Sequence, residues 1–212
     1  MQPGVIAVKN TAVKSRLELY TNTSPYPLLD QWFEEARSAE TVNFDAAQLA
    51  TVDDAGMPNI RTVLVRSRGK EGFVFYTNLD SKKGHELASH KKAALLFYWK
   101  SLSRQLRIRG NAALVDDKEA DEYFAQRPER SRVGAHVSLQ SSPLQSRATL
   151  EKSMTLYTMG FDGKPIPRPN RWSGFRIAPI QIEFWEEGPD RLHDRLYYEK
   201  RGPGWRRTLL YP

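Results

Sequence analysis

The sequence contains no cysteine among its 212 residues. This absence excludes disulfide bonds, thiolate zinc sites and cysteine nucleophiles, and it is consistent with a reducing cytosol. The four histidines, His85, His90, His136 and His193, never stand four residues apart as a helical metal-binding pair does. We therefore expect neither thiol chemistry nor a metal site.

Long apolar runs are also missing. The first twenty residues hold no stretch that resembles a signal peptide, and no window approaches the ~20 apolar residues of a membrane span. We therefore expect a soluble, cytoplasmic protein without a membrane partner. Hydrophobic residues still make up 40% of the chain, which is enough to form a folded core.

The net charge of +7 allows two interpretations. One is a solvated basic surface, which favours solubility. The other is an anionic partner, either a nucleic acid or small ligands that carry phosphate. The charge alone does not choose between them, so the positions of the arginines must decide.

The hydrophobic pattern predicts one domain over residues 25–212, preceded by a mobile polar arm over residues 1–24. An amphipathic helix is expected over residues 27–36, with Leu28, Leu29, Trp32 and Phe33 on its buried face. Many strands with few peripheral helices favour an antiparallel barrel, and no glycine-rich turn of a Rossmann fold is present. Strands are predicted at 48–53, 59–68, 73–78, 93–99, 104–115, 172–186, 192–199 and 205–210, and further helices at 82–89, 117–126 and 144–159.

Two strand segments carry a row of cations. In the first, alternation places Gln105, Arg107 and Arg109 on one face, and a barrel strand with a solvated outer face explains this row better than a ligand does. In the second, Arg191, His193 and Arg195 are expected on one face, where they repel one another unless an anion is present. A charged edge strand explains the second row equally well.

Two further segments could bind phosphate. Residues 127–134 gather three arginines and Ser131 at a junction between two predicted helices, although an exposed polar loop is the commoner interpretation of such a segment. Ser81 opens a helix that begins with Lys82 and Lys83, and an N-cap with solvated lysines is again the simpler interpretation. Taken together, several cationic sites on a barrel suggest two phosphorylated ligands, one of them an organic cofactor.

A set of motifs that occur in this order resembles the pyridoxine/pyridoxamine 5′-phosphate oxidase family, over about residues 27–212. They are Arg61-Thr-Val-Leu-Val, Phe75-Tyr-Thr-Asn, Ser81-Lys-Lys, Arg104-Gln, Tyr123-Phe, Arg127-Pro, Gln140-Ser-Ser, Trp172-x-Gly-Phe-Arg, Glu183-Phe-Trp and Arg191-Leu-His-Asp-Arg.

The resemblance implies a mainly β (α+β) fold, an antiparallel FMN-binding split β-barrel with peripheral helices, and a homodimer with FMN between the subunits. It assigns catalytic roles to Arg191 and His193. The implied FMN contacts are Arg61, Arg66, Tyr76, Thr77, Ser81, Lys82, Lys83, Gln105, Gln140, Ser141, Trp185 and Arg195. The implied substrate contacts are Arg66, Tyr123, Arg127, Ser131, Arg191 and His193.

The implied reaction belongs to vitamin B6 metabolism. Hydride removal from pyridoxine 5′-phosphate or pyridoxamine 5′-phosphate gives pyridoxal 5′-phosphate, with O2 as acceptor and H2O2 as product. Three alternatives remain: a related flavin oxidase of the phenazine-biosynthesis type, a non-catalytic protein that binds FMN or B6 phosphates, and a basic nucleic-acid-binding barrel. The resemblance predicts no nucleic-acid partner.

The sequence departs from the family pattern at three places. Arg66 stands where the family usually has lysine, and Lys82 stands where arginine is common. The arm matches the family only loosely, through Arg16 and Tyr20. Strand parity also predicts that Arg61 and Arg66 lie on opposite faces of their strand, unless a bulge intervenes.

Overall fold

The computed structural model describes residue 17 and residues 20–161 and 163–212. Most of the predicted arm, including Arg16, lies outside these residues, so its mobility stays a prediction. The described part of the arm contacts the domain: Leu17 is fully buried in the core, and the Tyr198 hydroxyl donates to the Asn22 carbonyl at 2.8 Å.

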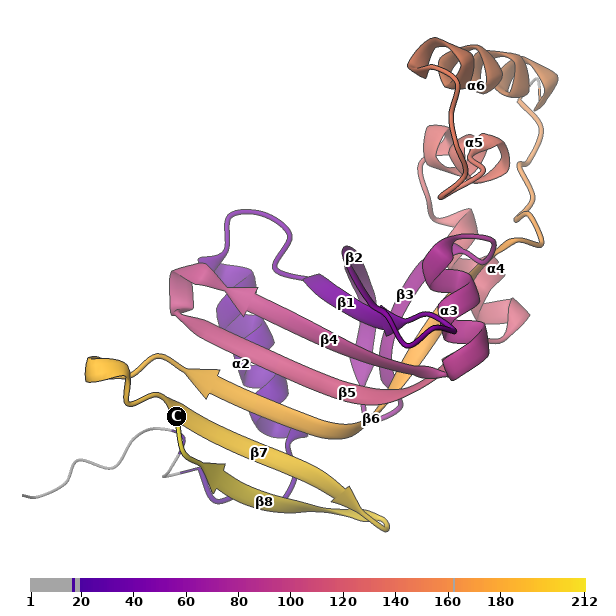
Figure 1. Cartoon of the computed structure of the whole chain (residues 1–212). Helices are drawn as coiled ribbons and strands as arrows, with labels where there is room; N and C mark the ends of the chain where they lie inside the picture. The colour runs from indigo at the N-terminus through magenta and orange to yellow at the C-terminus, as the bar shows by residue number, and fades with distance from the viewer. Residues whose placement is uncertain (1–16, 18–19, 162) are drawn as a thin grey trace, which may run out of the picture.

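The described chain forms one antiparallel sheet in the order β3-β2-β1-β4-β5-β6-β7-β8 (Figure 1). A further pairing of β3 with β6 closes six of the strands into a barrel, and β7 and β8 extend the sheet beyond it. The predicted split β-barrel is therefore confirmed. The strands are β1 (Ala46–Val52), β2 (Pro58–Gly69), β3 (Gly72–Asn78), β4 (Lys92–Trp99), β5 (Arg104–Leu114), β6 (Trp172–Glu186), β7 (Asp194–Arg201) and β8 (Gly204–Leu210).

The length of β6 explains how the barrel closes and extends at once. Its first part, residues 172–177, pairs with β3, and its last part, residues 181–186, pairs with β7. One strand therefore belongs both to the barrel and to the two-stranded extension.

Helix α2 (Tyr26–Ala39) provides one side of the core, as predicted. Leu28, Leu29, Trp32 and Phe33 are all buried. The Trp32 ring meets Phe184 edge-on with centroids 5.1 Å apart, a geometry that aromatic pairs favour. In Figure 1 this helix lies behind the sheet.

The other described helices are α3 (Lys82–His90), α4 (Asp117–Ala125), α5 (Glu129–Val137) and α6 (Arg147–Phe161). Figure 1 shows α4, α5 and α6 extending away from the barrel. Helix α5 was not predicted, because Val133 is the only buried residue within it and it therefore lacks an amphipathic stripe. Among the described helices, none has the length and apolarity needed to cross a membrane.

The expected strand at 192–199 begins later than predicted. Pro189–Arg191 form a 3₁₀ turn in which Asp190 and Arg191 have positive φ angles of 54° and 63°. The turn residues Gly188, Pro189 and Asp190 override the strand pattern here. The prediction that Arg191, His193 and Arg195 share one face of a strand is therefore wrong, because only the last of them lies in β7.

Candidate active site

The start of helix α3 gathers polar side chains from three parts of the chain. Ser81 is the N-cap, and its Oγ accepts from the Gly84 amide at 3.3 Å, as predicted. The Lys83 amine donates to Gln140 Oε1 at 2.7 Å and to Thr77 Oγ1 at 3.3 Å. We call this group the α3 cluster; it comprises Thr77, Ser81, Lys82, Lys83, Gln140 and Ser141, the last of which accepts from the Lys82 amide at 3.2 Å.

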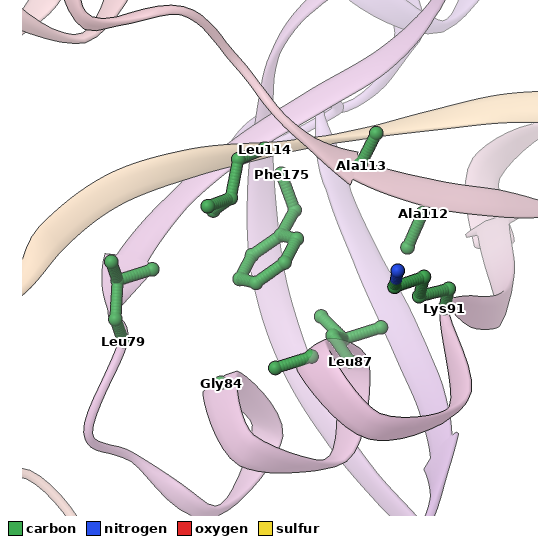
Figure 2. A pocket seen from close by; sticks show the side chains of 9 residues that line it. Leu79, Gly84, Leu87, Lys91, Ala112, Ala113, Leu114 and Phe175 are labelled. Carbon is green, nitrogen blue, oxygen red and sulfur yellow. The ribbon is translucent and has the colours of Figure 1, made fainter.

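The close approach of α3 to the preceding segment requires glycine. A Cβ on Gly84 would lie 2.0 Å from the carbonyl oxygen of Leu79, well inside van der Waals contact. Behind α3, an apolar hollow of about 400 Å³ is lined by Leu79, Leu87, Leu114 and Phe175, among others (Figure 2). None of the predicted site residues lines this hollow, so it is separate from the cluster.

Arg61 lies beside the α3 cluster. It stands directly opposite the core residue Leu49, and its guanidinium contacts the Glu86 carboxylate at 3.1 Å and the Thr51 hydroxyl. Burial alone would raise the pKa of Glu86, but hydrogen bonds from Thr51 and Asn59 and the charge of Arg61 outweigh it and hold that pKa below its usual value. Glu86 therefore stays ionised and fixes the guanidinium in place.

The cations at this end of the barrel exceed the anions that face them. Burial, and then the neighbouring charge of Arg61, lower the pKa of Lys83, while Glu86 opposes this shift. A phosphate group would relieve both effects by supplying negative charge and hydrogen-bond acceptors. The donors of the cluster, an amine, a guanidinium and the backbone amides of a helix N-terminus, are those that bind phosphate in proteins, so these residues fit the phosphate of FMN.

A second cationic group lies at the corner between α4 and α5. Tyr76 stacks on Tyr123 with centroids 3.9 Å apart and planes within 4°, and Trp172 lies parallel to Tyr76 at 5.3 Å. The Arg127 guanidinium lies over Trp172 at 4.8 Å, a cation–π contact. Ser131 follows in the first turn of α5, where its amide donates to the Pro128 carbonyl at 2.9 Å.

Arg127 has an unused donor. Its Nη1 atom is buried and has no hydrogen-bond partner among the described residues. Burial lowers the pKa of Arg127, and the nearby positive charge of Arg66 lowers it further, whereas Tyr123 acts in the opposite direction. A buried, unpaired guanidinium N–H is costly unless a ligand satisfies it, so this corner fits a second anionic group.

Arg66 stands on the side of β2 opposite to Arg61, as the parity argument predicted. Arg61 faces the interior, opposite Leu49, whereas Arg66 is exposed. The register between β2 and β3 shifts between Val65 and Ser67, so a bulge lies at Arg66 itself.

A third group lies on the strands that leave the barrel. Gln105 pairs with Trp185, and Trp185 pairs with Arg195, so adjacent positions of β5, β6 and β7 carry these three residues. The His193 ring lies 4.7 Å from the Trp185 ring, and its Nδ1 accepts from the Gly188 amide at 3.3 Å. Arg191 lies in the turn just before β7 and is exposed.

Within one chain, the structure separates this third group from the α3 cluster. Figure 1 shows α3 at the right-hand end of the sheet, whereas β7 begins at the left-hand end. Apart from Arg66, which lies at the bulge of β2, the predicted FMN contacts therefore divide into two sets: Arg61, Tyr76 and the α3 cluster at one end, and Gln105, Trp185 and Arg195 at the other.

Sequence reasoning assigned no role to Glu86, Asn59, Trp172 or Asp45, which hold the predicted arginines in place. Trp172 belongs to one of the quoted motifs, and Glu86 lies about one helical turn after the lysines of α3, so both carried a weak signal. The contacts of Asp45 depend on the bulge at Arg66 and could not be seen in the sequence. Among the described residues, no three His, Asp or Glu side chains gather as a metal site would require.

The chain is similar to known proteins over most of its length. A family model described as pyridoxamine 5′-phosphate oxidase matches residues 33–159, and one described as the C-terminal dimerisation region of pyridoxine 5′-phosphate oxidase matches residues 172–212. The chain is similar to a pyridoxine/pyridoxamine 5′-phosphate oxidase of Chelativorans sp. (strain BNC1), with 50% identity over 89% of this chain and 90% of the relative.

Two solved structures share the fold. PhzG from Burkholderia lata 383, in complex with tetrahydrophenazine-1-carboxylic acid, is 32% identical with a TM-score of 0.86, over 95% of this chain and 98% of that one. A pyridoxamine 5′-phosphate oxidase-related, FMN-binding protein from Nostoc punctiforme is 18% identical with a TM-score of 0.71, over 91% of this chain and 99% of that one. At 18% identity, the second similarity concerns the fold alone.

Proposed function

The chain belongs to the pyridoxamine 5′-phosphate oxidase family, and we propose that it oxidises pyridoxine 5′-phosphate and pyridoxamine 5′-phosphate to pyridoxal 5′-phosphate with FMN as cofactor. One observation carries this proposal: two cationic groups meet at the end of β3. Thr77 contacts Lys83 of the α3 cluster, while its neighbour Tyr76 stacks on Tyr123 beside Arg127. Consecutive side chains of a strand point to opposite faces, so β3 presents one candidate phosphate site on each side of its end.

The α3 cluster and Arg61 would hold FMN by its phosphate. When bound, FMN supplies a two-electron acceptor that takes the hydride from the substrate and passes the electrons to O2, which yields H2O2. The residues contribute binding and orientation. Arg61, Lys82 and Lys83 would neutralise the phosphate, and the Ser81 cap keeps the first amides of α3 directed toward it.

The corner between α4 and α5 would hold the substrate phosphate. Arg127 offers its unpaired Nη1, the Tyr123 and Ser131 hydroxyls can each donate one hydrogen bond, and Arg66 adds a second charge. Binding the phosphate at this corner orients the substrate and restricts its rotation before hydride transfer.

We further propose that the working unit is a homodimer in which each active site takes residues from both chains. Trp185 and Arg195 lie in the region that matches the family's dimerisation segment and Gln105 pairs with it, at the end of the sheet away from the α3 cluster of their own chain. The partner's copies would complete the FMN site. Arg191 and His193 would reach the pyridine ring from the same partner, where Arg191 acts by position and charge because it does not deprotonate near neutral pH.

The test is aerobic incubation of the FMN-loaded protein with pyridoxamine 5′-phosphate. We expect a yellow protein that forms pyridoxal 5′-phosphate and H2O2 in equal amounts. A yellow protein that forms neither would be a binding protein. A colourless protein whose nucleic-acid binding weakens steeply with salt would instead favour the basic-barrel alternative.

A second candidate is oxidation of a phenazine precursor, because the structure of PhzG is similar over nearly the whole chain. The identity to a pyridoxine/pyridoxamine 5′-phosphate oxidase is higher, at 50% against 32%. A cationic corner with an unpaired Arg127 also suits a phosphate. Parallel assays with pyridoxamine 5′-phosphate and a dihydrophenazine carboxylate decide between the two substrates. We propose that the protein works in the cytoplasm with O2 as electron acceptor, and that neither nucleic acid nor a membrane is a partner.

A further inference from the structure

Asp45 immediately precedes the first residue of β1 and forms an ion pair with Arg66. Its Oδ2 lies 2.8 Å from Arg66 Nη1, and its backbone carbonyl accepts from the Val65 amide at 2.9 Å. The backbone bond fixes Asp45 beside the bulge from which Arg66 projects. The carboxylate is largely covered, with 19% of the side chain exposed, whereas 37% of the Arg66 side chain is open to solvent.

Arg66 and Arg127 form a pair of cations close enough to influence each other. The charge of Arg66 contributes to the lowered pKa of Arg127, after burial. Within the described part of the chain, Asp45 is the carboxylate that forms an ion pair with either guanidinium. The two cations Arg66 and Arg127 therefore share one built-in anion, the Asp45 carboxylate that pairs with Arg66.

We propose that Asp45 competes with the phosphate of the substrate and of the product for Arg66, and so limits how tightly this site holds phosphorylated ligands. The proposal rests on the proposed function, in which Arg66 and Arg127 bind that phosphate. A phosphate monoester carries close to two negative charges near neutral pH and therefore repels a neighbouring carboxylate. A partly exposed ion pair contributes little net stability, so the Asp45–Arg66 contact is easily exchanged for another anion.

This competition also affects the release of the product. Substrate and product carry the same phosphate, so every cation that improves substrate binding also slows product release. Arginine in place of the usual lysine keeps its charge at all accessible pH values and offers several donors to a phosphate. Asp45 offsets that gain and leaves the site able to release its product.

The experiment compares Asp45→Asn with wild type in the FMN-loaded protein. The substitution keeps the size and one acceptor of the side chain and removes its charge. We expect the KM for pyridoxamine 5′-phosphate and the inhibition constant of pyridoxal 5′-phosphate to fall together by about two- to fivefold, a change of the size that partly exposed charge pairs give. Inhibition by pyridoxal, which lacks the phosphate, should not change.

Glu34→Gln is the matched control. Glu34 pairs with Arg68 on the same strand, at 3.4 Å, and its substitution removes the same charge away from the proposed site. We expect no change in either constant. A double-mutant cycle adds specificity: in an Arg66→Ala background, Asp45→Asn should have no effect on either constant.

The opposite result is equally informative. An unchanged or raised KM in Asp45→Asn, with an active wild-type enzyme, would overturn the inference, and a raised KM would show that Asp45 orients Arg66. If the wild type does not turn over pyridoxamine 5′-phosphate, the proposed function fails instead. Equilibrium binding of pyridoxal 5′-phosphate then tests the inference alone, and it is overturned unless Asp45→Asn binds that ligand more tightly than wild type.

Discussion

Arg61 shows how a single cation is prepared for an anionic ligand. Glu86 and Thr51 hold the guanidinium in place, and Lys83 stands close enough for its pKa to be lowered by the Arg61 charge. The Glu86 carboxylate orients the guanidinium. Because the Lys83 amine adds a second positive charge, the cations here exceed the anions. A phosphate is the ligand that this balance favours.

We therefore expect Arg61→Ala to weaken FMN binding more than substrate binding. The substitution removes a charge-assisted contact worth about 1.5–3 kcal/mol, which corresponds to roughly 10- to 150-fold in the dissociation constant of FMN. Fluorescence titration of the FMN-free variant measures that constant, and the KM for pyridoxamine 5′-phosphate at saturating FMN provides the comparison. A variant that purifies with a full complement of flavin would show that Arg61 does not hold the cofactor.

Glu86 makes the stability of this region depend on pH. Its pKa in the folded protein lies below the ordinary value of 4.5, so folding favours the ionised form. The resulting stabilisation is present above that ordinary value and is lost as the pH falls through the lower folded pKa. We expect Glu86→Gln to lose less stability than wild type between about pH 5 and pH 3. Thermal unfolding of both FMN-free proteins across that range measures the difference; parallel curves would contradict the assignment.

Arg191 is the residue that we expect to act on the reacting ring. Arg191→Ala should retain FMN and its yellow colour but lose most of its turnover. Arg191→Lys should restore little, because an ammonium group cannot lie flat over a ring as a guanidinium does.

Both substitutions keep a side chain at the left-handed φ of 63°, so they share any backbone strain and serve as mutual controls. Bound flavin and kcat/KM are the measurements. Near-normal activity in the alanine variant would refute the role, and loss of flavin would assign Arg191 to the cofactor.

At the scale of the element, helix α3 packs closely against the preceding segment because Gly84 has no side chain. Gly84→Ala would place its Cβ 2.0 Å from the Leu79 carbonyl oxygen, so the helix or the preceding segment must move. We expect a destabilisation of about 1–3 kcal/mol, the usual cost of overpacking, together with weaker FMN binding because the α3 cluster moves with the helix.

Gly160 in α6 is the control for this substitution. Apart from the backbone of α6 itself, no atom of the described residues lies within 4 Å of a Cβ built there, so Gly160→Ala should leave stability unchanged or raise it by up to about 1 kcal/mol. Urea unfolding of the two variants compares them directly. Equal stability of the two would mean that the contact with Leu79 does not constrain α3.

The elements also show what the sequence could and could not predict. Helix α2 and strand β5 have a strong apolar period, so the buried residues of α2 and the exposed face of β5 with Arg107 and Arg109 were predicted correctly. Helix α5 lacks such a period, and the turn at Pro189–Arg191 follows local turn chemistry instead of the strand pattern around it. The residues of the α3 cluster were named from a resemblance, but their contacts with Gln140 depend on how distant segments fold together, which no local pattern encodes.

For the whole molecule, the separation of the predicted FMN contacts is the main finding. The α3 cluster and the strand positions of Gln105, Trp185 and Arg195 lie at opposite ends of one sheet (Figure 1). A two-fold dimer can bring opposite ends of two chains together, because a residue at one end of the first chain contacts the other end of the second chain and the reverse contact is made as well. We therefore expect a flavin-loaded homodimer in analytical ultracentrifugation, and a flavin-loaded monomer would exclude the arrangement.

Complementation between two impaired variants, assayed at an FMN concentration too low to load Arg61→Ala, tests whether the sites are shared. Arg61→Ala damages the set of residues beside α3, and Arg191→Ala damages the set that precedes β7. In a mixed dimer with shared sites, one active site contains both substitutions and the other contains neither.

Random pairing makes half of the dimers mixed, so co-expression should restore about one quarter of wild-type turnover per site. Differently tagged chains and two-step purification isolate the mixed dimer, whose turnover should approach half of the wild-type value. If each chain builds its site alone, the mixed dimer holds two damaged sites and stays as inactive as its parents.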